Sequence, residues 1–138
     1  MKILIVCSTS FYNKIEEIKK ELNKKGHTVI MPNCYEDQDI DYDKMTEKEY
    51  LEFFKNMYHE SREKISTVDA ILVLNYSKEK DGKLLNNYIG GSTFLEMYEA
   101  FMQNKIIYML NGYPKSMLLD EIKGFNPILL NGNINNLK

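Results

Sequence analysis

A glycine pair and a hydroxyl stand before a glutamate at the predicted start of a helix. The residues are Gly90, Gly91, Ser92 and Glu96. Adjacent glycines let the backbone approach a ligand closely, and the first turn of a helix offers free N–H groups and a positive dipole end to anionic groups. A carboxylate held there stays ionised and can face a bound sugar. We therefore predict Glu96 as a catalytic residue and the three preceding residues as part of a binding site.

The spacing of Thr93 and Glu96 also fits a capping box, in which the glutamate only folds back onto a backbone N–H. Helical periodicity does not decide between the two interpretations, because the expected core stripe places Glu96 on the opposite face, where most glutamates are solvated. The members of that stripe are Phe94, Leu95, Tyr98, Phe101 and Met102. A first-turn position beside the strand ends supports the catalytic interpretation, because the side chain can reach a cleft from there. On the residues alone both interpretations stay open.

Hydroxyl groups also follow the first predicted strand. Ser8, Thr9 and Ser10 lead into a helix, so their hydroxyls and the helix amides could hold a phosphate or a sugar hydroxyl. The segment is neither a Walker loop nor a GxGxxG fingerprint, because it contains no glycine. Ordinary turn and capping hydroxyls are an equally good interpretation.

The remaining residue types that can do chemistry are scattered along the chain. Asp69 stands at the start of a strand, where a turn residue that hydrogen-bonds local amides is the simpler interpretation. His59 falls at the rim of an apolar helix face and is typical of a surface histidine. Cys7 and Cys34 have neither pairing nor metal-ligand spacing, so both are expected to be reduced thiols. The sequence therefore predicts no metal site and no cofactor.

Composition favours a single domain that acts on a small molecule. The chain has 138 residues and 43% hydrophobic content, which is enough for one compact domain over residues 1–138. Its 18 basic and 20 acidic residues are mostly interspersed and give a net charge of -2, so no basic surface indicates a nucleic-acid polymer or a membrane partner. The chain runs from Met1 directly into a short apolar strand without a signal segment, and we expect a cytoplasmic protein.

Apolar runs alternate with helical patterns along the chain. Strands are expected over residues 2–7, 28–31, 69–74, 105–110 and 127–130, and helices over about 14–25, 46–64, 92–103 and 115–123. This alternation predicts an α/β fold with a doubly wound, five-stranded parallel sheet flanked by helices, of the Rossmann-like or flavodoxin-like kind. Loops 7–13, 75–93 and 111–116 should then meet at the carboxyl ends of the strands.

The second predicted helix carries more apolar side chains than one sheet face requires. Tyr50, Phe54, Met57, Ser61 and Ile65 form its expected buried stripe. Three further apolar residues widen that stripe, namely Leu51, Phe53 and Tyr58. We expect part of this surplus to serve as a subunit contact in a homodimer or larger homo-oligomer.

Several of these features occur together in a known family. The run from Asp69 to Asn75, then Gly90-Gly91, then Glu96 and Ala100 resembles the nucleoside 2-deoxyribosyltransferase superfamily, which includes nucleoside 5'-monophosphate N-glycosidases. An Asn-Tyr-Ile-Gly-Gly stretch before the glutamate and an Asp-Glu-Ile at residues 120–122 are similar to small prokaryotic members.

The resemblance implies a role for each candidate residue. Glu96 matches the nucleophile that attacks the anomeric carbon and forms a covalent glycosyl-enzyme intermediate, and Asp69 matches a carboxylate that places or protonates the nucleobase. A nucleoside or nucleotide is thus the implied partner. The residues implied to surround the sugar and any 5'-phosphate are Ser8, Thr9, Ser10, Gly90, Gly91 and Ser92.

The chain departs from the family at specific positions. Deoxyribosyltransferases carry an aspartate six residues before the nucleophile, where this chain has Gly90, and a tyrosine in the first strand region, where it has Ile5 and Val6. The Gly-Ser-Ile-Arg-Gly-Gly phosphate turn of the monophosphate hydrolases is also missing. Asn86, Asn87 and Tyr88 are the candidates to replace the missing groups.

Because of these departures, two functions of other classes stay open. The first is a non-catalytic nucleotide-binding or sensing module of the same fold. The second is a flavodoxin-like flavin carrier, which the expected strand order and the hydroxyl-rich first turn would suit.

Overall fold

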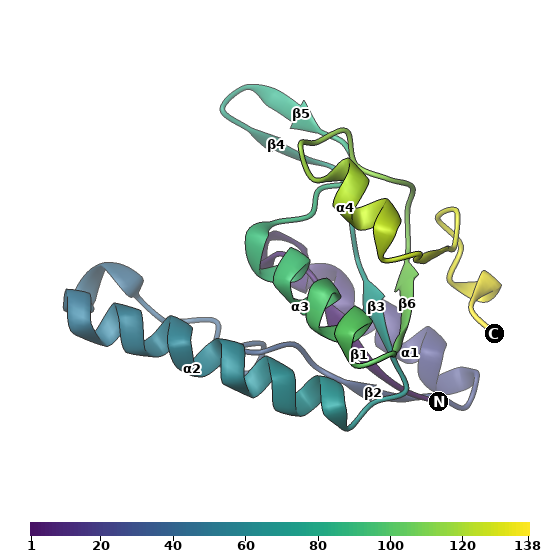
Figure 1. Cartoon of the computed structure of the whole chain (residues 1–138), viewed down its shortest axis with the longest axis horizontal. Coiled ribbons are helices and arrows are strands. Elements are labelled where there is room, and N and C mark those ends of the chain that lie inside the picture. The colour runs from purple at the N-terminus through teal and green to yellow at the C-terminus, as the bar shows by residue number, and fades with distance from the viewer.

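Five short parallel strands form the central sheet of the computed structural model, which describes residues 1–138 (Figure 1). In chain order they are β1 (Lys2–Val6), β2 (Thr28–Ile30), β3 (Ala70–Val73), β6 (Ile106–Met109) and β7 (Ile128–Leu129). They lie in the order β2-β1-β3-β6-β7, so the chain moves outward from β1 to β2 and then crosses to the other side of β1. The predicted α/β fold with a doubly wound, five-stranded parallel sheet is confirmed.

The strand register brings three loops to one edge of the sheet. Val6 is paired with Val73, and Val73 is paired with Met109. The segments that follow β1, β3 and β6 therefore leave the sheet side by side, at the edge where open α/β sheets bind ligands. The buried Asn75 joins two of these segments, because its side-chain amide donates to the backbone carbonyl of Gly112 at 2.9 Å and its oxygen accepts from the N–H of Asn111 at 2.9 Å.

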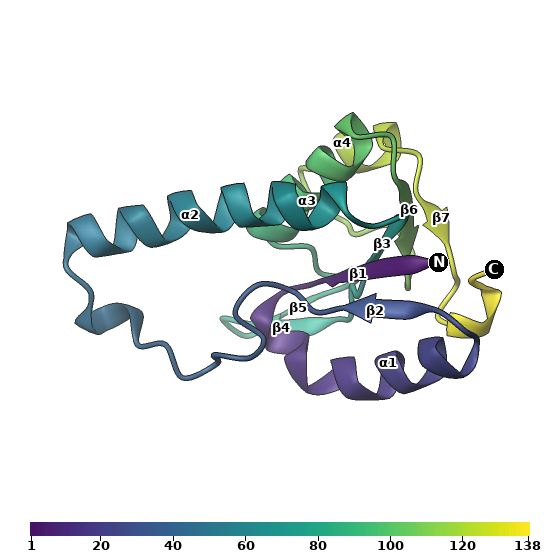
Figure 2. The same ribbon diagram turned by 90° about the horizontal axis from the view of Figure 1, so that it is seen from below.

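Helices cover both faces of the sheet, so the strands alternate between two cores (Figure 2). One core joins the sheet to α1 (Ile15–Lys24) through Ile15, Ile18 and Leu22. The other core joins it to α2 (Glu47–Ser66), α3 (Gly91–Met102) and α4 (Leu119–Gly124). Burial on both faces explains why the strand sequences are almost continuously apolar.

Helix α2 extends well beyond the sheet (Figures 1 and 2). Its predicted start is confirmed by a capping box between Thr46 and Glu49. Ser61 and Ile65 are its only buried residues, whereas Tyr50 is 43% exposed. The prediction of a buried stripe along the whole helix was wrong, because the first half of α2 extends past the sheet and its Phe53 and Phe54 pack on Tyr42 instead (Figure 2).

Helix α3 packs in a different orientation from the predicted one. The residues that it buries are Thr93, Met97 and Ala100. Most of the predicted core stripe is instead exposed, with Leu95, Tyr98, Phe101 and Met102 each between 44% and 56% exposed. Thr93, Met97 and Ala100 thus form the packed face, and the aromatic side chains of α3 lie partly on Phe125, which follows α4. Glu96 therefore lies next to the packed face of α3.

The polar segment between β3 and α3 contains a hairpin that the sequence analysis missed. Strands β4 (Lys78–Lys80) and β5 (Lys83–Leu85) pair antiparallel as a separate two-stranded sheet. Asp81 and Gly82 form the turn between them, with φ of 52° and 74°, as a two-residue hairpin turn requires. None of the helices combines the length and apolar character needed to cross a membrane.

The role of Asn75 in connecting two loops can be tested by removing its side-chain amide. Asn75→Ala should lower the free energy of unfolding by about 2–4 kcal/mol, because it leaves buried backbone groups of the 111–112 segment unpaired. Asn56→Ala, on the exposed part of α2, is the matched control and should change stability by less than about 0.5 kcal/mol. Urea denaturation measures both, and equal effects would contradict the assigned role.

Candidate active site

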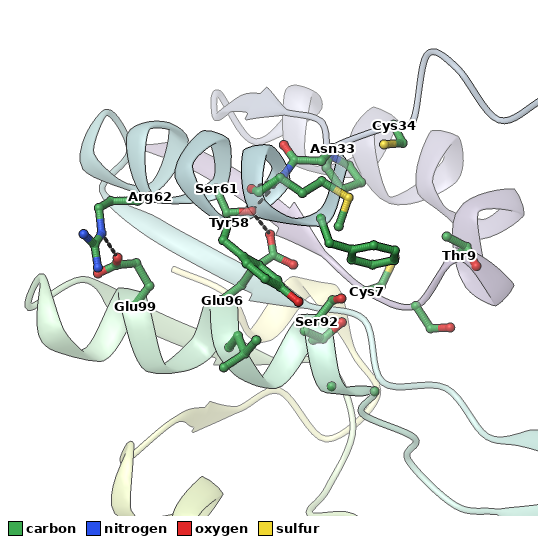
Figure 3. Close-up of a pocket in the computed structure, with 18 of the residues that line it drawn as sticks. Cys7, Thr9, Asn33, Cys34, Tyr58, Ser61, Arg62, Ser92, Glu96 and Glu99 are labelled. Atoms are coloured by element: carbon green, nitrogen blue, oxygen red, sulfur yellow. Dashed lines mark hydrogen bonds and ion pairs between the residues drawn. The ribbon is translucent and has the colours of Figure 1, made fainter. Parts of the chain in front are cut away.

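A cleft of about 570 Å³ opens at the carboxyl edge of the sheet, between α2 and α3 (Figure 3). Its walls come from the segments after β1 and β2, the second half of α2 and the start of α3. Six of the predicted site residues line it: Ser8, Thr9, Gly90, Gly91, Ser92 and Glu96. The volume lies within the range of small-molecule sites.

Asp69 does not line this cleft. It precedes β3 and therefore lies at the amino edge of the sheet, opposite the cleft. Its Oδ2 accepts a hydrogen bond from the backbone N–H of Lys2 at 2.8 Å. Asp69 is thus a turn residue that hydrogen-bonds a nearby backbone amide, in line with the simpler interpretation of the sequence. The catalytic role that the family resemblance implied for Asp69 is not supported, because the residue lies at the wrong edge of the sheet.

Ser10, Asn87 and Tyr88 lie beside the cleft and do not line it. Ser10 accepts a hydrogen bond from Lys78 Nζ at 3.2 Å, and the same ammonium lies 4.4 Å from the centre of the Tyr88 ring. Asn87, at φ 54°, donates to the backbone carbonyl of Tyr113 at 3.4 Å. These three residues support the loops at the cleft.

Tyr88 lies against Gly90. A Cβ atom built on Gly90 would lie 3.2 Å from the Tyr88 hydroxyl, which is closer than ordinary van der Waals contact. A side chain at position 90 would therefore require a small movement of the tyrosine.

Glu96 points into the cleft and is not a capping residue. Helix α3 begins at Gly91 with Gly90 as its N-cap, and no side chain caps it. The Glu96 carboxylate instead accepts a hydrogen bond through Oε2 from the hydroxyl of Ser61 on α2, at 3.3 Å. The capping-box interpretation of Thr93 and Glu96 is therefore wrong.

Burial changes the acidity of Glu96, so the expectation that this carboxylate stays fully ionised was wrong. Loss of solvent around the carboxylate raises its pKa to about 7, and the Ser61 hydrogen bond and the charge of Lys64 only partly oppose this shift. Burial, with a smaller contribution from Glu96, also raises the pKa of the Cys7 thiol to about 12. At neutral pH the cleft thus holds a neutral thiol beside a carboxylate that exchanges its proton readily.

A second carboxylate at the cleft is already paired. Glu99 forms an ion pair with Arg62, and this contact lowers the pKa of Glu99 (Figure 3). The two acids lie on the same helix, but one is desolvated and one is neutralised by a cation. Glu96 is therefore the cleft carboxylate that is free to react.

Sequence analysis missed several cleft residues that come from other elements. Tyr12, Asn33 and Tyr58 line the cleft from η1 (Thr9–Lys14), the segment after β2, and α2. Ser61 was predicted to be buried, and its polar character within an apolar stripe was a signal for a specific partner. No group of three or more His, Cys, Asp or Glu side chains is arranged to hold a metal ion.

The raised pKa predicts that Glu96 destabilises the fold once it ionises. Between its ordinary pKa and about 7 the folded chain binds more protons at this residue than the unfolded chain, so stability falls as pH rises through that window. Glu96→Gln should therefore stabilise the protein increasingly from about pH 5 to about pH 8.5, by up to about 3 kcal/mol. Thermal or urea unfolding at several pH values measures the difference.

Glu99→Gln is the matched control for this measurement. The lowered pKa of Glu99 contributes stability above its ordinary value, which is lost as pH falls, so its replacement should destabilise the protein at neutral pH. A stabilisation by Glu96→Gln that does not depend on pH would contradict the assigned desolvation.

Comparisons with known proteins agree with this fold. No protein-family model matches the chain, and no curated protein matches it by sequence. The structure of a CMP N-glycosidase from Clostridium botulinum matches with a TM-score of 0.54 at 12% identity, over 99% of this chain and 94% of that one. A 2-deoxyribosyltransferase from Bacillus psychrosaccharolyticus matches with a TM-score of 0.49 at 19% identity, over 88% of this chain and 81% of that one. The chain therefore shares the fold of this CMP N-glycosidase, as the sequence resemblance predicts.

Proposed function

We propose that this protein is an N-glycosidase or N-glycosyl (deoxyribosyl) transferase that cleaves the glycosidic bond of a nucleoside or nucleoside monophosphate through Glu96. The observation that carries the proposal is the desolvated carboxylate of Glu96, which lies in the cleft beside the Gly90-Gly91 turn. The fold shared with a CMP N-glycosidase supports the same class of substrate.

Glycosidic bonds break through a transition state that resembles an oxocarbenium ion. The Glu96 carboxylate stabilises the developing positive charge and then forms a bond to the anomeric carbon. The bond from that carbon to the base breaks, its electron pair leaves with the base, and the base takes up a proton. Water or a second base then attacks the anomeric carbon and releases Glu96.

The cleft offers separate surroundings for the two halves of such a substrate. Aromatic side chains of Tyr12, Phe54 and Tyr58 line one part and can contact a base. Ser92 and the glycine turn lie at the start of α3 and can approach the sugar or a phosphate. Because Asp69 lies at the other edge of the sheet, the proton for the leaving base must come from the cleft, where His59 is a side chain of the acid-base type.

The proposal is tested by replacing the nucleophile. Glu96→Ala should lower release of free base by at least about a thousandfold, because no other cleft residue forms the covalent intermediate. Chromatography of reactions with deoxynucleosides, ribonucleosides and their monophosphates, with and without an acceptor base, measures release and distinguishes hydrolase from transferase. Glu121→Ala, on α4 outside the cleft, is the control with unchanged turnover, and retained turnover in Glu96→Ala would refute the proposal.

The pH dependence of turnover gives a separate test. Glu96 must be ionised to attack, so kcat/KM should fall as pH decreases through about 7, with an acid limb centred there. Initial rates measured across this range locate the midpoint. An acid limb near the ordinary pKa of a glutamate would contradict the role of a desolvated Glu96.

A non-catalytic nucleotide-binding or sensing module is the second candidate. The position of Asp69 outside the cleft and the lack of a side chain at Gly90 favour it, because both family carboxylates that assist the nucleophile are then missing from the site. Saturable binding of a nucleotide with no base release across the same substrate panel would support this candidate over the enzyme.

We propose that the protein is a homodimer or larger homo-oligomer in which a second copy covers exposed apolar residues of α3. Leu95 and Tyr98 are exposed at the cleft, and Phe101 and Met102 extend the same helix surface. Covering this surface would also exclude water from the cleft, which bears on the choice between water and a base as acceptor.

The cytoplasmic location expected from the sequence stays a prediction.

A double substitution tests the assembly. Phe101→Lys with Met102→Lys should dissociate the protein to a monomer, because it places two charges in the proposed contact. Met117→Lys is the matched control, since Met117 is 93% exposed elsewhere and should leave the mass unchanged. Light scattering after size exclusion measures the mass, and a monomeric wild-type protein would disprove the assembly.

A further inference from the structure

A line of hydrogen bonds leads from the segment after β2, through α2, to Glu96 (Figure 3). The side-chain amide of Asn33 donates to the backbone carbonyl of Met57 at 3.2 Å and to the hydroxyl of Ser61 at 2.7 Å. Ser61 in turn donates to Glu96 Oε2 at 3.3 Å. Asn33 and Ser61 are 9% and 8% exposed, so water competes little for these bonds.

The direction of every bond in this line is determined by one group. The carbonyl of Met57 can only accept, so Asn33 must turn its NH₂ group toward Met57 and Ser61. The Ser61 oxygen therefore accepts from Asn33, and its single hydrogen is available for Glu96. The reversed amide would place two oxygens against each other.

The surroundings of Asn33 satisfy its backbone carbonyl but leave its side-chain oxygen unpaired. Its backbone carbonyl accepts from the Tyr12 hydroxyl at 2.8 Å, which holds the residue in place. Its side-chain oxygen is buried without a hydrogen-bond partner.

Ser61 is the only side chain that hydrogen-bonds to Glu96. Other titratable groups face the carboxylate from three elements without such a bond. They are Cys7 from the end of β1, Tyr12 from η1 and Lys64 from α2. The two oxygens of Glu96 are therefore not equivalent, since Oε2 is held and Oε1 is free.

We propose that Ser61, oriented by Asn33, is a positioning residue that holds Oε2 of Glu96 and thereby selects Oε1 as the attacking oxygen. The inference rests on the proposed function, in which Glu96 is the nucleophile. Oε1 bonds to the anomeric carbon while the electron pair of the broken bond leaves with the base. Oε2 becomes the carbonyl oxygen of the ester and still accepts from Ser61. When water attacks the anomeric carbon, the same hydrogen bond stabilises the departing carboxylate.

The test uses the titration of the Glu96 side-chain carboxyl carbon, followed by carbon NMR in the ligand-free protein. Ser61→Ala should move the midpoint to higher pH, because the hydrogen bond favours the ionised form. Asn33→Ala should shift it in the same direction by less, since Ser61 then loses only its orientation. Ser61→Thr restores a hydroxyl and should titrate close to the wild type.

Ser66→Ala is the matched control, because Ser66 lies on the same helix and its hydroxyl bonds only to the backbone of Glu63. It should leave the Glu96 midpoint unchanged. A purely structural role for Ser61 predicts lower thermal stability with an unchanged midpoint in Ser61→Ala, and that result would overturn the proposal.

Kinetics complete the test. Ser61→Ala should lower kcat by about tenfold or more with KM within about twofold, and should move the acid limb upward. The NMR titration needs no turnover, so it distinguishes failure of the proposed function from failure of the positioning role. A wild-type protein that releases no base refutes the proposed function even if the midpoint shifts. An active wild type with an unshifted Ser61→Ala midpoint refutes the positioning role alone.

Discussion

The parallel register of three neighbouring strands is the constraint on which the rest of the structure depends. With Val6 beside Val73 and Val73 beside Met109, the chain leaves the sheet three times at one edge. Polar segments that are far apart in sequence meet there, and Asn75 joins two of them by hydrogen bonds. Helices packed on both faces fix this edge, so the first turn of α3 and the second half of α2 face one another across a cleft.

How far the sequence predicts this arrangement depends on the range of the interactions involved. The strands and the capped start of α2 follow from local patterns, and the glycine turn before Glu96 indicates the place of this residue at the cleft. The rotation of α3 and the overhang of α2 depend on tertiary packing, which periodicity alone does not contain. Asp69 is a different case. A residue that precedes a parallel strand lies at the amino edge of the sheet, away from the cleft. The direction of β3 therefore argued against the catalytic role of Asp69 that the family resemblance implied.

At Glu96 the burial that the proposed chemistry needs lowers the stability of the fold. A carboxylate without its water shell costs free energy when it ionises, and the same loss of solvent makes it reactive toward a positive centre. The covered sheet offsets this cost, because its two cores bury most side chains of the central strands β1, β3 and β6. Ser61 moderates the cost, since one hydrogen bond keeps the carboxylate ionisable near neutral pH.

Helix α2 has two different surroundings along its length. Its buried residues, Ser61 and Ile65, lie near its carboxyl end, whereas its first half extends past the sheet (Figure 1). Met57, Tyr58 and Ser61 line the cleft between these two parts. One continuous helix thus connects the hydrogen-bond donor to Glu96 with a surface that projects into solvent.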